Sequence, residues 1–429
     1  MREDGVVIGS VLLGAATLLA VHFLLLHSYW DYSEGVYALT AHEMLHGGDL
    51  YGRIVGAQPP GVFLAGVALE AIHSSVEWLR FGVGCLQLGA GLIAARIVFR
   101  VSGNRAATVL TPAAMLLTPW AVHEHGALTP ELVALPVMLG AALLSADARR
   151  GVVTGALCGV LVLIKLPLAI PAVMLVLMSA DVRRAAPAAL GTLGAGLALT
   201  WLAGGSGFWR DVIVAQLHSG SRSLGELGGF WAQAGWNVLG LLVCASVAVW
   251  LRRRARDRRL LAVAIALGVA NLVTFLSNFK LGTGLNITVP VEASLVPLAA
   301  VGITFAFAAR ARLAAAACAV GAVFTLAQSI SLIASPSHPI PFLRAFSAPA
   351  WEITLTPAQF EQAVRNARAC PAGQAYGGPP LIALAADRQL PADQPDQFLP
   401  SHSPTLAAVN AQITAVRNVC PESLAPGTS

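Results

Sequence analysis

The residues best suited to chemistry lie just after the first long apolar segment of this 429-residue chain. That segment, residues 6–26, contains no Asp, Glu, Lys or Arg and is long enough to cross a bilayer. Asp31 and Glu34 follow it directly. Carboxylates at a membrane boundary cost free energy unless they are solvated or used, so this pair predicts a functional loop at one membrane surface.

Helix capping is the structural alternative for these two acids. Apolar positions between Tyr37 and Leu45 recur at helical spacing, which predicts an amphipathic helix lying on the membrane. Asp31 would cap that helix, and Glu34, at the third helical position, would complete a capping-box-like pair. Capping does not require the rest of the loop, which runs through two glycines to a Gln-Pro-Pro-Gly segment beginning at Gln58.

Composition places the chain among polytopic helical membrane proteins. It is 56% hydrophobic and 11% charged, with a mean hydropathy of +0.70, whereas soluble domains carry about 25% charged residues. Apolar runs of about 20 residues recur along it, each matching a hydrocarbon thickness of about 30 Å. The sequence has no P-loop, no GxGxxG motif and no Cys/His metal-ligand spacing, which argues against nucleotide chemistry.

Arginine clusters set the expected topology. The largest lies at 252–259, and smaller ones lie at 149–150, 183–184 and 310–312. Nucleic-acid binding would need a folded basic face with interleaved aromatics, so we expect no nucleic-acid partner. The positive-inside rule places all four clusters in the cytoplasm. Counting crossings from them predicts 11 spanning helices, one of them over 105–122, with the N-terminus cytoplasmic and the C-terminus extracytoplasmic.

Two segments are unusual in this count. Both ends of residues 149–184 are cytoplasmic, so the stretch must leave and return as two short helices. These turn near Lys165, which places that lysine at or below the outer surface. If residues 61–76 crossed the membrane fully, the arginines that follow would be placed outside the cytoplasm. We therefore expect a juxtamembrane or re-entrant helix there, inside a long outer loop, 27–78.

Two regions follow from this pattern. Residues 1–334 form the transmembrane domain, and residues 335–429 form a small Pro-rich extracytoplasmic region with limited core, partly extended. The tail also contains Cys370 and Cys420, which could pair in an oxidising compartment. We expect a multi-pass protein of the plasma membrane.

The first outer loop resembles that of the GT-C superfamily of polytopic membrane glycosyltransferases. The likeness lies in the run Asp-Tyr-Ser-Glu-Gly-Val-Tyr-Ala-Leu that begins at Asp31, the run Met-Leu-x-Gly-Gly-x-Leu-Tyr that ends at Tyr51, and the Gln-Pro-Pro-Gly that ends at Gly61. Weaker segments that fit the same pattern are 127–131, 155–167 and 280–292. The superfamily includes protein O-mannosyltransferases, lipid A aminoarabinose transferases and actinobacterial cell-envelope transferases.

This resemblance, which covers residues 6–334, implies an all-α GT-C bundle and a reaction. A sugar would pass from a polyprenyl-phosphate donor to an envelope glycan, lipid or protein acceptor at the outer face, with inversion at the anomeric carbon. By match within the motif, Asp31 is the base that activates the acceptor hydroxyl. Glu34 is its partner, orienting the loop or holding a cation. The chain has Asp-Tyr-Ser-Glu instead of an adjacent Asp-Glu pair, so the division of labour stays open, as does a divalent cation.

A leaving phosphate needs cationic or hydrogen-bond stabilisation. Lys165, Arg222 and Lys280 are the outward cations, and Gln58 and Glu131 complete the expected donor-binding set. Each has a structural alternative. The lysines could snorkel or anchor a helix end, the arginine could belong to a flexible loop, and the glutamate could cap a helix. The polar run 123–125 could bind a metal, but neighbours on one helix turn do not converge well.

Two other functional classes compete with the transferase. A transporter or flippase would suit the charges and broken helices near Lys165, although no inverted repeat is visible and the carboxylates lie in a surface loop. A non-catalytic envelope scaffold would leave the site-like loop without a purpose. The sequence does not identify the sugar, the acceptor or the oligomeric state.

Overall fold

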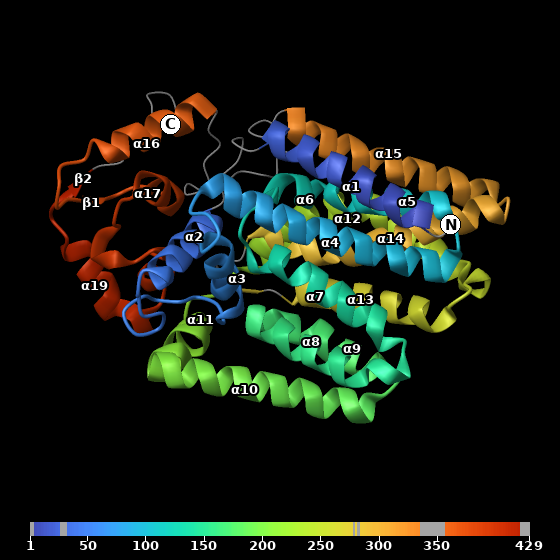
Figure 1. Ribbon diagram of the computed structural model, residues 1–429, viewed down its shortest axis with the longest axis horizontal. Coiled ribbons are helices and arrows are strands. Elements are labelled where there is room, and N and C mark those ends of the chain that lie inside the picture. The colour runs from blue at the N-terminus through green and yellow to red at the C-terminus, as the bar shows by residue number, and fades with distance from the viewer. Residues whose placement is uncertain (1–3, 26–31, 278, 281–283, 335–356, 421–429) are drawn as a thin grey trace.

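Helices form almost the whole molecule (Figure 1). The computed structural model describes residues 4–25, 32–277, 279–280, 284–334 and 357–420. The long bundle consists of α1 (Asp4–Leu25), α4 (Val76–Ser102), α5 (Arg105–Leu116), α6 (Pro119–Glu124), α7 (Pro130–Ser145), α8 (Gly151–Ile164), α9 (Ala169–Met178), α10 (Val182–Trp209), α12 (Leu224–Trp250), α13 (Arg258–Leu276), α14 (Thr288–Ala308) and α15 (Arg312–Ala334).

Shorter elements gather at one end of the bundle. They are α2 (Tyr32–Leu45), α3 (Gly61–Glu70), a π-helical turn (Arg210–Val214) that continues into α11 (Ala215–Leu217), and the tail. The tail contains α16 (Pro357–Arg368), β1 (Ala375–Tyr376), α17 (Pro380–Ala386), α18 (Phe398–His402), α19 (Ala407–Ala415) and β2 (Val419–Cys420). Figure 1 shows α2, α3 and the tail at the end opposite the start of α1.

The membrane-type helical class is confirmed, but the count of 11 crossings is not. In the described part of the chain, six helices are long and apolar enough to span a membrane, and α12, bent by 53°, makes a seventh if it is one span. Helices α7, α8 and α9 are shorter than these spans. The break between α8 and α9 falls at Lys165, where the sequence predicted a turn. The count of 11 stays a prediction.

One expected span is broken. The sequence predicted a continuous helix over 105–122, whereas α5 ends at Leu116 and α6 begins at Pro119. Proline disfavours helical backbone in the residue before it, and Thr118 is extended, with φ −70° and ψ 153°. After the break, Trp120 of α6 joins the core.

Arginine-bearing loops meet at the other end of the bundle. Arg100 forms an ion pair with Asp257 at 2.6 Å. The backbone N–H of Arg256 donates to the carbonyl of Val101 at 2.9 Å, and Arg259 donates to the carbonyl of Met178. Thus the ends of α4 and α9 and the start of α13 come together.

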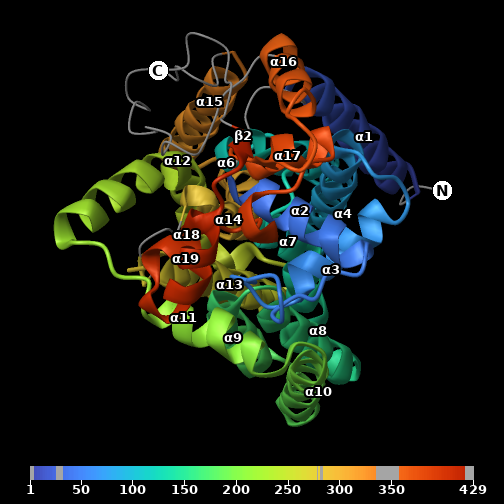
Figure 2. The same cartoon turned by 90° about the vertical axis from the view of Figure 1, so that its left-hand side faces the viewer.

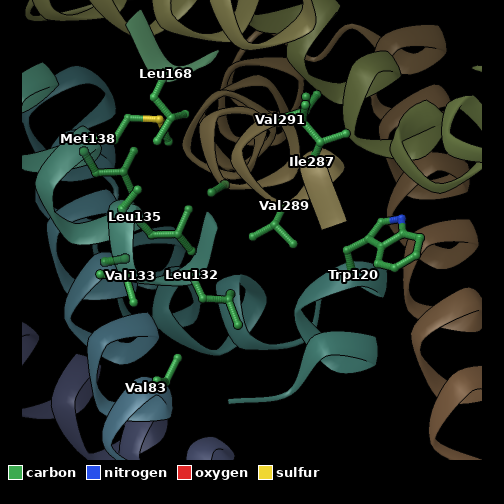
Figure 3. Packing of buried hydrophobic residues seen from close by; sticks show 14 of the residues in the cluster. Val83, Trp120, Leu132, Val133, Leu135, Met138, Leu168, Ile287, Val289 and Val291 are labelled. Carbon is green, nitrogen blue, oxygen red and sulfur yellow. The ribbon is translucent and has the colours of Figure 1, made fainter. Parts of the chain in front are cut away.

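The core is built around α14, which is the most enclosed span. Its side chain Val289 faces Leu132 and Leu135 of α7, whereas Val291 lies beside Ile287 on another side of the helix (Figure 3). The central helix therefore holds its N-terminal end, next to residues 279–286, in a fixed position against α7. This rigid end carries one wall of the site described below.

The sequence was wrong about the environment of α2. A helix is present, but every residue from Glu34 to Ala41 is buried, so α2 does not lie on the membrane as an amphipathic helix. Helix α3 covers one side of it, and α17 of the tail packs against another (Figure 2). A Cβ at Gly35 would lie 2.6 Å from the backbone nitrogen of Leu381, so the glycine permits this close approach.

The tail is a folded cap. Its strands β1 and β2 pair in parallel, and a disulfide joins Cys370 to Cys420, which confirms that predicted pairing. Gln394 accepts a hydrogen bond from the N–H of Val55 at 3.0 Å and donates to the carbonyl of Arg53 at 2.7 Å. The tail thus holds the first outer loop directly.

Candidate functional site

A cavity of about 430 Å³ opens at the end of the bundle that carries α2 and α11. Its wall is contributed by α2, the loop after Gly56, the α8–α9 turn, the segment around α11 and the loop before α14. The lining residues are Ser33, Tyr37, Ala57, Gln58, Pro59, Lys165, Leu166, Pro167, Val212, Ile213, Gln216, Leu217, Gly220, Ser221, Phe279, Lys280, Gly284 and Asn286. Three of the five predicted donor-binding residues, Gln58, Lys165 and Lys280, are therefore together.

Both lysines of the chain line this cavity. The sequence contains 27 basic residues, and Lys165 and Lys280 are the only two that are lysine. They are 115 positions apart in the sequence (280 − 165), so the fold alone brings them to one site. Such a concentration of the rarer cation favours a site that binds a negatively charged group.

Lys165 is held by its local backbone and by an acid. It follows α8 in extended conformation, with φ −155°, and its N–H donates to the carbonyl of Leu161 at 3.1 Å. Its ammonium forms an ion pair with Glu131, whose side chain is almost completely buried. Glu131 is thus placed next to the cavity-lining lysine and does not line the cavity itself.

Lys280 is held by a short extended segment. The N–H of Arg222 donates to the carbonyl of Phe279 at 2.8 Å, and its guanidinium donates to the carbonyl of Lys280 at 3.1 Å. Among the described residues no ion pair involves Lys280. Burial lowers the pKa of Lys280 to about 8, and Lys165 lowers it further, while Asp396 of the tail opposes the shift.

Arg222 is placed behind this wall. It is not among the lining residues, and its guanidinium lies 4.4 Å from the ring centroid of Phe230. Its bonds to the 279–280 backbone brace the loop that presents Lys280. Arg222 therefore supports the wall of the cavity.

Gln58 is positioned by a tight loop. The hydroxyl of Tyr51, a residue with φ of +69°, donates to the carbonyl of Gln58 at 2.6 Å. Gln216 donates to the carbonyl of Ala57 at 2.7 Å, and itself lines the cavity. The Gln-Pro-Pro-Gly motif thus forms a fixed rim.

Glu34 does not line the cavity. Both of its oxygens accept hydrogen bonds from Arg80, at 2.7 Å from Nε and 2.6 Å from Nη2. The two side chains are 2% and 3% exposed, so this fork is a fully buried ion pair. It ties the first turn of α2 to α4, which favours orientation of the loop over cation binding as the role of Glu34.

Comparison with known proteins identifies the fold. No protein-family model matches the sequence, and no curated protein matches it significantly. Two solved structures of ArnT from Cupriavidus metallidurans are similar. The one bound to undecaprenyl phosphate is 18% identical, with a TM-score of 0.60 over 94% of this chain and 88% of that chain. The apo structure is 19% identical, with a TM-score of 0.61 over 97% and 89%.

This chain has the fold of ArnT. The resemblance read from the first outer loop is therefore confirmed at the level of the fold. At this identity the likeness extends to architecture, and the roles of individual residues rest on the geometry of this chain.

The predicted base lies outside the described residues. Asp31 immediately precedes α2, which begins at Tyr32, and Ser33 lines the cavity. The hydroxyl of Tyr32 accepts a hydrogen bond from the N–H of Gln397 at 2.9 Å, so the tail holds the start of α2. In the sequence, Asp31 is two positions before this cavity-lining residue.

The described part of the chain contains no group of three or more His, Cys, Asp or Glu side chains arranged to hold a metal. In the polar run 123–125, His125 is buried and packs edge-on against His22, with ring centroids 6.1 Å apart. A divalent cation at Asp31 stays open, because that residue is not described.

Sequence reasoning missed two kinds of residue. One is Arg80. An arginine near the start of an apolar helix normally has a buried acidic partner, and this signal was overlooked. The other is Asn286, which lines the cavity and is 7% exposed, and whose side-chain oxygen has no hydrogen-bond partner among the described residues. The lysine count was the overlooked signal for the site as a whole.

Proposed function

We propose that this protein is an inverting glycosyltransferase that takes a sugar from a polyprenyl-phosphate donor. The observation that carries the proposal is the cavity lined by both lysines of the chain at the end of a GT-C bundle. The ArnT structure of the same fold was solved with undecaprenyl phosphate bound, which supports a lipid phosphate as the anionic ligand.

The phosphate would lie against the cationic side of the cavity. Lys280 supplies a positive charge that is in no ion pair among the described residues, and Gln58 and Asn286 supply neutral polar groups. Lys165 contributes through its ion pair with Glu131. Preorganised donors of this kind stabilise the charge that develops on a departing phosphate.

The prenyl chain would leave the cavity over its apolar wall. Leu166, Pro167, Val212 and Ile213 line that wall. Leu217, at its rim, is 78% exposed, as expected for a side chain that faces lipid acyl chains. The cavity therefore combines a charged end for the headgroup with an apolar exit for the chain.

Asp31 acts as the general base in this proposal. It removes the proton from an acceptor hydroxyl whose oxygen attacks the anomeric carbon from the face opposite the phosphate. The new carbon–oxygen bond forms, the bond from that carbon to the phosphate oxygen breaks, and polyprenyl phosphate leaves with the bonding electron pair. Glu34 and Arg80 position the base by fixing the first turn of α2.

The test replaces Asp31 with Asn, which removes the base, keeps nearly the same shape and still caps a helix. Purified protein in nanodiscs receives a polyprenyl-phosphate sugar and envelope extract, and release of polyprenyl phosphate is measured. We expect a folded variant with turnover reduced by about 10²–10⁴-fold. Unchanged turnover would remove Asp31 as the base. A wild-type protein that moves the lipid across the bilayer without consuming it would be a flippase.

We also propose that the α2 end of the molecule lies outside the cytoplasmic membrane, with the N-terminus inside. The clustering of arginines at the opposite end supports this orientation. Single cysteines in a background without native cysteines would be labelled with an impermeant reagent. A cysteine at Gln58 should react in intact cells, whereas one at Arg256 should react only after permeabilisation. The reverse pattern would overturn the orientation.

A further inference from the structure

A second cavity, of about 510 Å³, lies between the tail and the start of α4, and shares no lining residue with the lysine cavity. Figure 2 shows α16 and α17 on the side of the molecule where α4 starts. Its volume falls within the range of about 300–1,000 Å³ typical of small-molecule sites. The lining residues are Glu70, Ser74, Ser75, Val76, Glu77, Leu79, Phe360, Glu361, Val364, Arg365, Arg368, Leu384 and Ala385.

The floor and the rim of this cavity differ in chemistry. Apolar side chains that include Phe360, Val364 and Leu79 are buried and form the floor. The rim carries four exposed charged residues, which are Glu77, Glu361, Arg365 and Arg368. An apolar floor under a rim of hydrogen-bonding groups of both charges is suited to a ring with one CH-rich face and a hydroxyl-bearing edge.

Glu70 is the buried polar group of the site. It is 3% exposed, and its Oε1 accepts hydrogen bonds from Nδ1 of His42 at 2.5 Å and from the hydroxyl of Ser74 at 2.9 Å. Its Oε2 has no hydrogen-bond partner among the described residues. A buried oxygen without a donor costs roughly 1–3 kcal/mol, and a ligand hydroxyl that enters the cavity supplies the donor.

The charges of the cavity select against other ligands. The lining has three carboxylates, Glu70, Glu77 and Glu361, against two arginines, so it presents no excess positive charge for a phosphate or another anion. Arg365 forms an ion pair with Glu361 at 3.5 Å, so the negative charge of Glu361 is already balanced and does not select a cation. A purely apolar ligand would leave the rim groups without partners. A neutral polyhydroxylated ligand satisfies all three conditions.

We propose that this second cavity is a saccharide-binding site, and that the acceptor of the transferase is therefore a glycan. The assignment of the acceptor rests on the function proposed above, whereas the binding of saccharide does not. The site would hold a sugar unit of the acceptor away from its reacting end, with the ring over Phe360 and a hydroxyl bonded to Glu70.

The experiment measures saccharide binding without turnover. Full-length protein in nanodiscs prepared without glycoside detergent is mixed with millimolar maltose, isomaltose, cellobiose or chitobiose, and saturation-transfer NMR detects contact with the ring protons. We expect saturation of at least one disaccharide by the wild type. Glu70→Gln should weaken that binding about tenfold, and Val364→Trp, which fills the cavity, should abolish it.

The lysine cavity provides the matched control. Lys280→Met should leave disaccharide binding unchanged, because Lys280 does not line this site. The proposal is overturned if no disaccharide is saturated, or if Glu70→Gln and Val364→Trp both bind like the wild type. Either result would leave the transferase proposal standing, since that proposal is tested by release of polyprenyl phosphate.

Discussion

The two lysines line one cavity but have opposite surroundings. Lys165 lies at the α8–α9 turn with its ammonium against buried Glu131, so its charge is already compensated. Lys280 lies on an extended loop with no ion-pair partner among the described residues, and its pKa is lowered to about 8. The difference indicates that Lys165 mainly holds the cavity together, whereas Lys280 retains charge for a ligand.

The largest effect should come from breaking the compensated pair. Lys165→Met leaves Glu131 buried without its cation and should reduce the free energy of unfolding by about 3–5 kcal/mol. Lys165→Met combined with Glu131→Gln should recover most of that loss, because neither residue is then charged. Denaturation followed in matched nanodiscs measures both variants. A single variant as stable as the wild type would show that the pair does not hold the cavity.

A smaller effect, distant from both lysines, should follow from loss of the tail disulfide. Cys370→Ser with Cys420→Ser should cost about 2–4 kcal/mol of tail stability. Hydrogen exchange should rise in β1 and β2 and stay unchanged around Lys165 in the bundle. Equal exchange in the double variant and the wild type, or a rise throughout the bundle, would contradict a locally stabilising bond.

The pH dependence of donor use separates the lysines. Lys280 is protonated below its pKa of about 8, so the KM for the donor should rise as the pH increases through that value, by up to about tenfold per unit. The fold itself should not weaken there, because a lowered lysine pKa means that deprotonation favours the folded state. Lys280→Arg should flatten the profile. A profile with no rise between pH 8 and 9 in the wild type would remove Lys280 from phosphate binding.

The smallest predicted effect concerns the contribution of the tail to the site. Asp396 opposes the lowering of the Lys280 pKa, so Asp396→Asn should lower that pKa further. Asn can still accept the hydrogen bonds that Asp396 accepts from the N–H groups of Phe398 and Leu399. Because the chain has two lysines, reductive ¹³C-methylation gives separable NMR signals for a pH titration. An unchanged titration would show that the tail does not act on Lys280.

Much of the fold could be read from the sequence because apolar length and arginine position report directly on the bilayer. The helical class, the turn at Lys165 and the clustering of arginine loops all followed from those two signals. The break before Pro119 was visible in principle, since proline restricts the residue before it. The burial of α2 was not, because α17, which covers it, lies more than 300 residues further along the chain.

The site was predicted in part for the same reason. Gln58 was chosen from the Gln-Pro-Pro-Gly motif, whereas Lys165 and Lys280 were chosen as outward cations, and the cation criterion found two residues of one cavity. It could not distinguish Arg222, which braces the wall, from a lining cation. Nor could it foresee which acid would pair with Arg80, because Glu34 is 46 positions away in the sequence.

The most direct test of the central claim is protection of Lys280 by the lipid. Purified protein at pH 8 is treated with an amine-acylating reagent, with and without saturating undecaprenyl phosphate, and modification of Lys280 is followed by mass spectrometry. The N-terminal amine serves as the internal control. The account predicts that the lipid slows modification of Lys280 about tenfold and leaves the N-terminus unaffected. Equal modification of Lys280 with and without the lipid would contradict a donor phosphate bound in this cavity.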